Sequence, residues 1–306
     1  MGRVTQRAPA VRLEVSDSSV TRVVDRPDTV VVEAPMEIRV DGVPLTVTMR
    51  TPGDDFDLCL GFLLSEGLIT GADDVRRLMH CQDEDESGSP TYNVVDVTLA
   101  DGVAGPTDRD ARRFLTTSAC GVCGTASIDA VRTTGRYDVH ADDTLVDPAV
   151  LVRLPDQLRG HQKVFDRTGG AHAAGLFTQD GELVVVREDI GRHNAVDKVV
   201  GWAAREGRLP LTGHVLVVSS RASFELTQKA FVAGIPILAA VSAPSSLAIE
   251  LATEVGLTLV GFVRDPRLTV YSGRQRLGVP DGSLRDGLRN DLGAESGRGI
   301  SVSTTG

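Results

Sequence analysis

Four continuous apolar runs separated by amphipathic stretches constrain the fold of this 306-residue chain more than any other feature. The runs are residues 184–186, 214–218, 235–241 and 257–262. The stretches between them, with a helical pattern, are residues 191–205, 223–233 and 246–255. Buried strands that alternate with helices are typical of a largely parallel sheet covered on both faces. The pattern predicts an α/β domain over residues 145–277.

Polar residues follow three of these predicted strands. They are Ser219-Ser220-Arg221, the segment from Ser242 to Ser246, and the segment from Arg264 to Arg267. In α/β sheets, ligands bind where strands end and loops begin. We therefore expect a ligand site at these strand ends.

The preceding part of the chain has a different pattern. Apolar and polar residues alternate on both sides of Asp41-Gly42, which predicts a hairpin over residues 37–50. Asp54 or Asp55 can cap a helix over the apolar run from Phe56 to Ile69, and residues 95–99 alternate as another strand. Residues 31–115 are therefore predicted to form a smaller, strand-rich α+β domain.

Three further segments complete the predicted organisation. Residues 1–30 form an N-terminal lead, and residues 116–144 contain a cysteine loop and a connecting segment. Residues 278–306 are rich in Gly, Ser, Asp and Arg without apolar periodicity, which predicts a mobile tail.

Composition excludes several classes of protein. The net charge of −10 disfavours a general nucleic-acid binder. No apolar run approaches the roughly 20 residues that cross a bilayer, and the N-terminus lacks a signal-peptide core. Four cysteines are few for a disulfide scaffold and fit a reducing compartment. We expect a cytoplasmic protein with no nucleic-acid or membrane partner.

The strongest local signal for chemistry is the loop Cys120-Gly121-Val122-Cys123-Gly124. Two thiols at this spacing can exchange protons and sulfur, and the arrangement favours the reactive thiolate. The glycines keep the loop open to a bulky partner. A predicted helix from Thr125 to Val131 would direct its N-terminal amides toward the thiols. Metal ligation, disulfide exchange and persulfide transfer all fit this pattern.

The alternatives to persulfide transfer have weaker support. A closed zinc site needs four ligands, whereas Cys59 lies in an apolar helix and Cys81 stands alone beside the acidic loop at residues 83–86. A thioredoxin pair follows a strand early in a βαβ unit, but this pair lies between two predicted domains. An inert pair of buried thiols also remains open.

A zinc deaminase is a further alternative. Its signature is His-x-Glu followed by Pro-Cys-x-x-Cys, with the Glu as general acid and base. Here the residue two after His172 is Ala174, the residue before the cysteine pair is Ala119, and the pair precedes the His. We reject deaminase activity but not a related fold.

Residues 187–198 are dense in polar groups. His193 and Asp197 lie four apart and can pair on one helix face. The segment is either the solvated start of an amphipathic helix or a helix N-terminus that contacts a ligand.

Together these motifs resemble the FdhD family of formate dehydrogenase accessory sulfurtransferases. The resemblance runs in order from about Pro35 to Arg276. The matching segments are residues 120–124, 168–175, 188–198, 220–225, 243–246, 261–264 and 270–272.

The resemblance implies a C-terminal domain of cytidine-deaminase-like fold without deaminase chemistry. It also implies a sulfur carrier that accepts sulfur from a cysteine desulfurase. The sulfur passes to a molybdenum or tungsten bis-guanine-dinucleotide cofactor before the cofactor enters formate dehydrogenase. The family further suggests a homodimer. A cofactor chaperone that transfers no sulfur, and a thiol-disulfide oxidoreductase, remain the alternatives.

The resemblance also assigns residues. Cys120 matches the persulfide-bearing cysteine, and Cys123 matches the second cysteine of the loop. The cofactor-binding segment matches Phe262, Val263, Arg264, Asp265, Pro266 and Arg267. Arg264 and Arg267 offer guanidinium groups suited to phosphate, and Phe262 either stacks on a base or belongs to the core.

Overall fold

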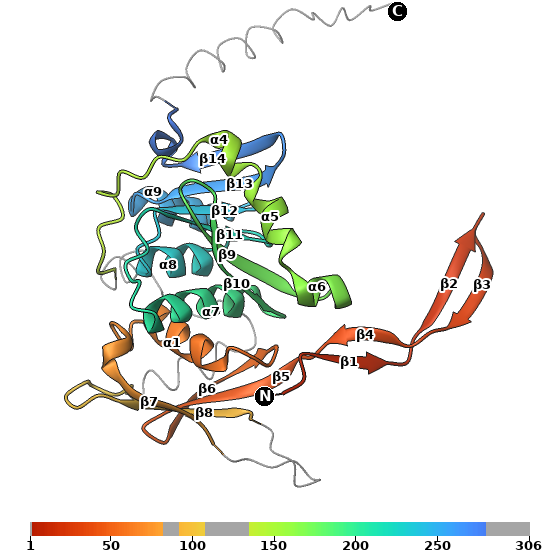
Figure 1. Cartoon of the computed structure of the whole chain (residues 1–306), viewed down its shortest axis with the longest axis horizontal. Helices are drawn as coiled ribbons and strands as arrows, with labels where there is room; N and C mark the ends of the chain where they lie inside the picture. Colours follow the sequence, from red (N-terminus) through yellow and green to blue (C-terminus); the bar gives the residue numbers. More distant parts are fainter. Residues whose placement is uncertain (1, 82–91, 108–134, 280–306) are drawn as a thin grey trace, which may run out of the picture.

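The structure is a computed structural model that describes residues 2–81, 92–107 and 135–279 (Figure 1). Its larger sheet has the strand order β10-β9-β11-β12-β13-β14. The strands are β9 (His172–Thr178), β10 (Leu183–Asp189), β11 (His214–Val218), β12 (Ile237–Ala240), β13 (Thr258–Arg264) and β14 (Arg267–Ser272). The four predicted strands are thus confirmed as β10 to β13.

The expectation of a largely parallel sheet is wrong. Only β11, β12 and β13 are mutually parallel, whereas β9, β10 and β14 pair antiparallel with their neighbours. β10 is an edge strand joined to β9 by a tight turn, so it needs no helical crossover. The mixed sheet still carries helices on both faces.

Helices α7 (Arg192–Arg205), α8 (Phe224–Val232) and α9 (Ser246–Glu254) confirm the three predicted helices. They share one apolar core with alternate residues of the central strands, including Leu216 and Leu238. The other strand residues, such as Val217 and Ala239, face α4 (Pro148–Leu151) and α5 (Leu154–Gly160). Helix α6 (Lys163–Thr168) follows α5, and the 3-10 turns are Ala72–Asp74 and Arg274–Leu277.

The smaller unit is a four-stranded sheet of order β6-β5-β8-β7 with one helix on its inner face. Its elements are β5 (Ala34–Val40), β6 (Val43–Arg50), α1 (Asp55–Ser65), β7 (Val75–His80) and β8 (Val94–Leu99). The predicted hairpin and the strand at residues 95–99 are confirmed. The predicted helix ends at Ser65 rather than Ile69, because the left-handed backbone of Gly67 follows it.

Helices α1 and α7 lie against each other and join the two units (Figure 1). A Cβ atom on Gly61 would overlap the backbone carbonyl of Asp197, and one on Gly201 would overlap that of Asp57. The glycines therefore permit a crossing in which the two backbones touch. Side chains from both sheets consequently belong to one continuous core.

Residues 1–30, expected only as a lead, contribute to an arm of paired strands. The strands are β1 (Thr5–Ala8), β2 (Val11–Ser16), β3 (Ser19–Asp25) and β4 (Asp28–Val31). β1 pairs with β4, and β2 pairs with β3 as a hairpin that extends away from both sheets (Figure 1).

Candidate functional site

The carboxyl ends of β11, β12 and β13 meet at one edge of the larger sheet, as their parallel pairing requires. The residues after β11 and β12, and the end of β13, therefore lie along this edge, and the ligand site expected there stays a prediction. His172 begins the antiparallel strand β9 and is the register partner of Asp189, the last residue of β10. Five strands thus present polar residues at one edge, which we call the carboxyl edge.

The two cysteines predicted to carry the chemistry, Cys120 and Cys123, lie outside the described residues, as do the acidic loop and the C-terminal tail. The other two cysteines are free thiols. Cys59 is fully buried in α1, and this burial raises the pKa of its thiol. Cys59 is therefore unsuited to sulfur chemistry.

The predicted cofactor segment forms the turn between β13 and β14. Arg264 and Arg267 are register partners with exposed side chains, and Asp265-Pro266 lies between them. Val263 is fully buried and faces the core, so its side chain cannot contact a ligand. The structure thus separates the residues of this segment into an exposed set and a buried one.

Phe262 has an unusual conformation. Its φ angle is +51°, a left-handed value that is strained for a bulky side chain, and 43% of its surface is exposed. Its backbone N–H donates to the Ser242 carbonyl over 3.2 Å, which ties it to the loop after β12. The alternative that Phe262 belongs to the core is wrong. Val241 and Leu247 are also exposed near this loop, so apolar surface accompanies the arginines.

A cluster of polar side chains lies at the starts of α7 and α8. His193 of α7 places Nε2 3.4 Å from the Ser223 hydroxyl and 3.7 Å from a Glu225 carboxylate oxygen. His172 is half-buried, and burial, the Arg192 charge and His193 all lower its pKa. We call His172, Arg192, His193, Ser223 and Glu225 the histidine cluster. Arg192 Nε is shielded from solvent and has no hydrogen-bond partner within the described part of the chain.

Glu225 is the acid of the histidine cluster. Burial alone would raise its pKa, but the contact with His193, its own backbone N–H and Ser223 lower the pKa to about 2. The carboxylate therefore stays ionised at neutral pH and balances part of the cluster's positive charge.

Replacement of Glu225 by Gln should reduce the acid sensitivity of folding. Because the folded-state pKa lies below the ordinary 4.5, ionised Glu225 stabilises the fold above about pH 4.5, and this contribution is lost as the pH falls toward 2. Urea unfolding on either side of pH 4.5 should show a smaller loss of stability for Glu225→Gln than for the wild type. Glu250→Gln, at an exposed glutamate of α9, is the matched control; equal losses in all three proteins would contradict the assignment.

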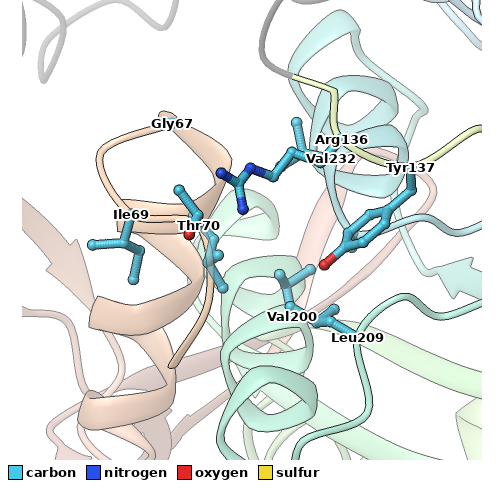
Figure 2. Close-up of a pocket in the computed structure, with 10 residues that line it drawn as sticks. Gly67, Ile69, Thr70, Arg136, Tyr137, Val200, Leu209 and Val232 are labelled. Carbon is cyan, nitrogen blue, oxygen red and sulfur yellow. The ribbon is translucent and has the colours of Figure 1, made fainter. Parts of the chain in front are cut away.

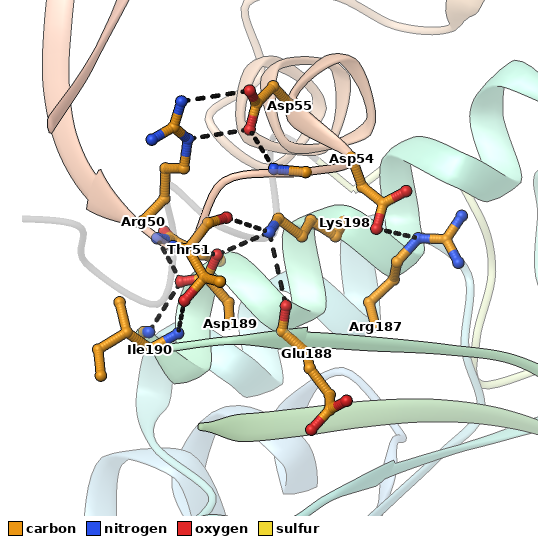
Figure 3. Close-up of polar contacts among 12 residues, drawn as sticks. Arg50, Thr51, Asp54, Asp55, Arg187, Glu188, Asp189, Ile190 and Lys198 are labelled. Atoms are coloured by element: carbon orange, nitrogen blue, oxygen red, sulfur yellow. Dashed lines mark hydrogen bonds and ion pairs between the residues drawn. The ribbon is translucent and has the colours of Figure 1, made fainter. Parts of the chain in front are cut away.

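The loop that leads into α7 is held by buried polar contacts with the smaller unit (Figure 3). One Asp189 oxygen accepts from the Thr51 N–H at 3.1 Å and pairs with Lys198 Nζ at 2.8 Å. The Ile190 N–H donates to the Thr51 hydroxyl at 3.0 Å, and Lys198 also donates to the Thr51 carbonyl at 2.9 Å. The second Asp189 oxygen accepts from the Gly191 N–H at 2.8 Å. The position of Arg192 and His193 thus depends on the contact between the two units.

The predicted pair of His193 with Asp197 is wrong. Asp197 is buried and pairs with Lys229 at 2.7 Å, and it accepts from the Ser65 hydroxyl at 3.0 Å. The interpretation of residues 187–198 as a solvated helix start is wrong for the same reason, because Asp189, Asp197 and Lys198 are all buried. The segment joins the two units and ends at the carboxyl edge.

A cavity of about 550 Å³ lies between α1, α7 and α8, near their C-terminal ends and away from the carboxyl edge (Figure 2). Its walls are largely apolar, with Ile69 and Val200 among them, and Arg136 and Tyr137 add polar groups.

The described residues contain no group of three His, Cys, Asp or Glu side chains placed to hold a metal ion. No helix in the described part of the chain is long and apolar enough to cross a membrane.

Comparison with known proteins identifies the family. The model of the FdhD/NarQ family matches residues 31–278. The chain belongs to the FdhD/NarQ family. Its relatives include the sulfur carrier protein FdhD of Streptomyces avermitilis, 57% identical over 91% of this chain and 98% of that protein. The same-named protein of Mycobacterium tuberculosis is 55% identical over 85% of this chain and 95% of that one.

A solved structure supports the fold. A formate dehydrogenase accessory protein from Desulfotalea psychrophila matches with a TM-score of 0.69 and 23% identity, over 90% of this chain and all of that one. The family model and the relatives of 55–57% identity, rather than this structure, confirm the resemblance seen in the sequence at the level of the family. The FdhD/NarQ match covers the cysteine loop and the contact between the two units. It also covers the β13–β14 turn and the histidine cluster at the carboxyl edge.

Sequence reasoning assigned no role to three residues of the histidine cluster. Arg192, Ser223 and Glu225 each lie in a motif that carries the family resemblance, but their motifs are separate in sequence. The available signal was the position of Ser223 and Glu225 just after a predicted strand, where ligand sites occur.

Proposed function

We propose that this chain is a sulfur carrier that accepts sulfur from a cysteine desulfurase as a persulfide on Cys120. It then passes the sulfur to the molybdenum bis-guanine-dinucleotide cofactor that formate dehydrogenase requires. One observation carries the proposal: the Cys120–Gly124 loop lies within the matched residues of a chain 57% identical to a named sulfur carrier. The action of the protein is thus that of a sulfurtransferase, in the cytoplasm, with desulfurase and formate dehydrogenase as partners.

The loading step follows from thiol chemistry. The Cys120 thiolate attacks the outer sulfur of the desulfurase persulfide, and the desulfurase cysteine leaves as a thiolate. The sulfur atom moves without any external oxidant or reductant, because one sulfur–sulfur bond forms as another breaks. Cys123, three positions after the proposed nucleophile Cys120, favours its thiolate form.

The carboxyl edge has the size and charge of a site for a long phosphorylated cofactor. β9 and β13 are three strand spacings apart in the sheet, which places His172 roughly 14 Å from the end of β13. Arg264 and Arg267 suit the phosphates of a nucleotide, and the exposed ring of Phe262 suits its base. The histidine cluster would then face the part of the cofactor nearer the metal.

Alanine substitution of Arg264 or Arg267 should weaken binding of guanine nucleotides by roughly one to two orders of magnitude. The reason is the loss of a charge-assisted contact worth about 1.5–3 kcal/mol. Calorimetric titration of guanosine diphosphate measures this, with Arg153→Ala, at an exposed arginine near α5, as the control. Unchanged affinity in both variants, or equal binding of adenosine diphosphate, would contradict the pocket.

A deletion strain tests the function itself. Cells without this chain should make formate dehydrogenase protein that is inactive because the cofactor lacks its sulfur. Treatment of that enzyme with sulfide under reducing conditions should restore activity if only sulfur is missing. An enzyme that contains no cofactor at all would support a chaperone that protects the cofactor instead. An active enzyme in the deletion strain would refute both functions.

A further inference from the structure

A basic surface lies where the base of the arm meets α6 (Figure 1). The Arg167 guanidinium donates to the Thr5 hydroxyl at 3.1 Å, so the end of α6 is fastened to β1. Arg7 lies two residues after Thr5 and therefore on the same face of β1. Lys163 lies four residues before Arg167 and shares one face of α6 with it. We call Arg7, Lys163 and Arg167 the basic patch.

The charges of the basic patch are exposed and without ion pairs. Its three side chains are exposed, and none pairs with a carboxylate in the part of the chain that the structure describes. β1, β4 and α6 contain only two acidic residues. Asp166 pairs with Arg159, and Asp28, the register partner of Ala8, lies on the opposite face from Arg7. The patch is therefore a local exception in a chain whose net charge is −10.

Two contacts place the basic patch beside the carboxyl edge. The Glu188 carboxylate accepts from two N–H groups in the first turn of α6, at 2.8 and 2.9 Å, and so fixes α6 to the end of β10. A Cβ atom on Gly170 would lie 3.0 Å from a Val31 methyl carbon, so the base of the arm touches the segment that leads into β9. His172 of the histidine cluster follows two residues later. The patch thus extends the carboxyl edge outward.

We propose that the basic patch docks an acidic surface of the enzyme that receives the cofactor. This inference rests on the proposed function, under which the receiving enzyme is formate dehydrogenase. A cofactor held at the carboxyl edge must leave from that edge, so the receiving enzyme has to approach it and meets the patch beside it. The desulfurase, by contrast, acts on the loop that contains Cys120.

A protein partner fits the basic patch better than other polyanions do. Arginine is enriched in protein–protein interfaces, and exposed charges at their rim mainly accelerate association. A nucleic acid or an anionic membrane would be repelled by the rest of a chain with a net charge of −10. The patch therefore steers an acidic partner to the carboxyl edge, and its effect falls as salt screens the charges.

Binding of formate dehydrogenase purified from cells that make no molybdenum cofactor tests the proposal. Biolayer interferometry with the full chain measures the association rate and the affinity at low and at high salt. The double variant Arg7→Glu/Lys163→Glu reverses two charges and leaves the contact between Arg167 and Thr5 in place. It should bind at least about tenfold more weakly at low salt, mostly through slower association, and should approach the wild type at high salt.

The double variant Arg12→Glu/Arg153→Glu is the matched control. It makes the same change of net charge at two exposed arginines outside the patch and should bind formate dehydrogenase as the wild type does. Equal weakening by the two double variants would overturn the proposal. A wild-type chain that does not bind the enzyme, or that binds it equally at every salt concentration, would overturn it as well.

Two further measurements identify what the patch contacts. Binding of guanosine diphosphate and binding of the desulfurase should be the same for Arg7→Glu/Lys163→Glu and the wild type. Weaker nucleotide binding would assign the patch to the cofactor pocket, and an equal loss of desulfurase binding would show a contact that does not select the receiving enzyme; either result overturns the proposal. Sulfur loading of Cys120 does not involve the patch, so a wild-type chain that binds formate dehydrogenase but takes up no sulfur would contradict the proposed function alone.

Discussion

Formate dehydrogenase matured with the Cys120→Ala variant is expected to be inactive, whereas the wild-type chain restores full activity. A persulfide is a good sulfur donor because attack on its outer sulfur releases a stabilised thiolate, and alanine can form no persulfide. Formate oxidation in a deletion strain complemented with each variant measures the effect. Thermal unfolding of the purified variant should match the wild type.

Cys81→Ala is the matched control for this experiment, because Cys81 is a free thiol outside the loop. It should support full maturation. Cys123→Ala should reduce maturation no more than Cys120→Ala does. Full activity with Cys120→Ala would remove the sulfur relay from the account.

Replacement of Lys198 by Met should destabilise the fold by about 3–5 kcal/mol. The Lys198 and Asp189 side chains are 1% and 0% exposed, so the substitution leaves a buried carboxylate without its cation. The Thr51 carbonyl also loses a donor. The change should appear as a lower urea midpoint at neutral pH, with an unchanged dependence of stability on urea concentration.

Lys163→Met makes the same chemical change at an exposed lysine of α6 and should alter stability by no more than about 0.5 kcal/mol. A loss for Lys198→Met as small as that of Lys163→Met would show that the pair does not hold the units together.

The sequence predicts most reliably the elements whose pattern reflects burial. β11, β12 and β13 are continuous apolar strands, and the hairpin of β5 and β6 alternates around Asp41-Gly42. β9 escaped detection because its sequence, His172–Thr178, contains two alanines and a glycine, which have low strand propensity. The hairpin of the arm was missed although residues 11–15 alternate between apolar and charged side chains, and its apolar residues are exposed in the structure.

The candidate site can be predicted from the sequence only in part, because much of it depends on contacts between residues that are distant in the chain. Motifs mark His172, His193 and the segment from Phe262 to Arg267, but contacts between distant residues decide what each motif does. Asp189 is held by Thr51, which lies 138 positions away in sequence. Asp197 likewise pairs with Lys229 rather than with the nearby His193, and no local periodicity distinguishes these partners.

The central claim is that Cys120 carries sulfur, and intact mass spectrometry tests it most directly. The purified chain is incubated with a cysteine desulfurase and cysteine, and its mass is measured before and after treatment with a thiol reductant. We expect the wild type and Cys81→Ala to gain the mass of one or more sulfur atoms, removable by the reductant, and Cys120→Ala to gain none. A wild-type chain that gains no sulfur, or a Cys120→Ala variant that gains as much as the wild type, would contradict the account.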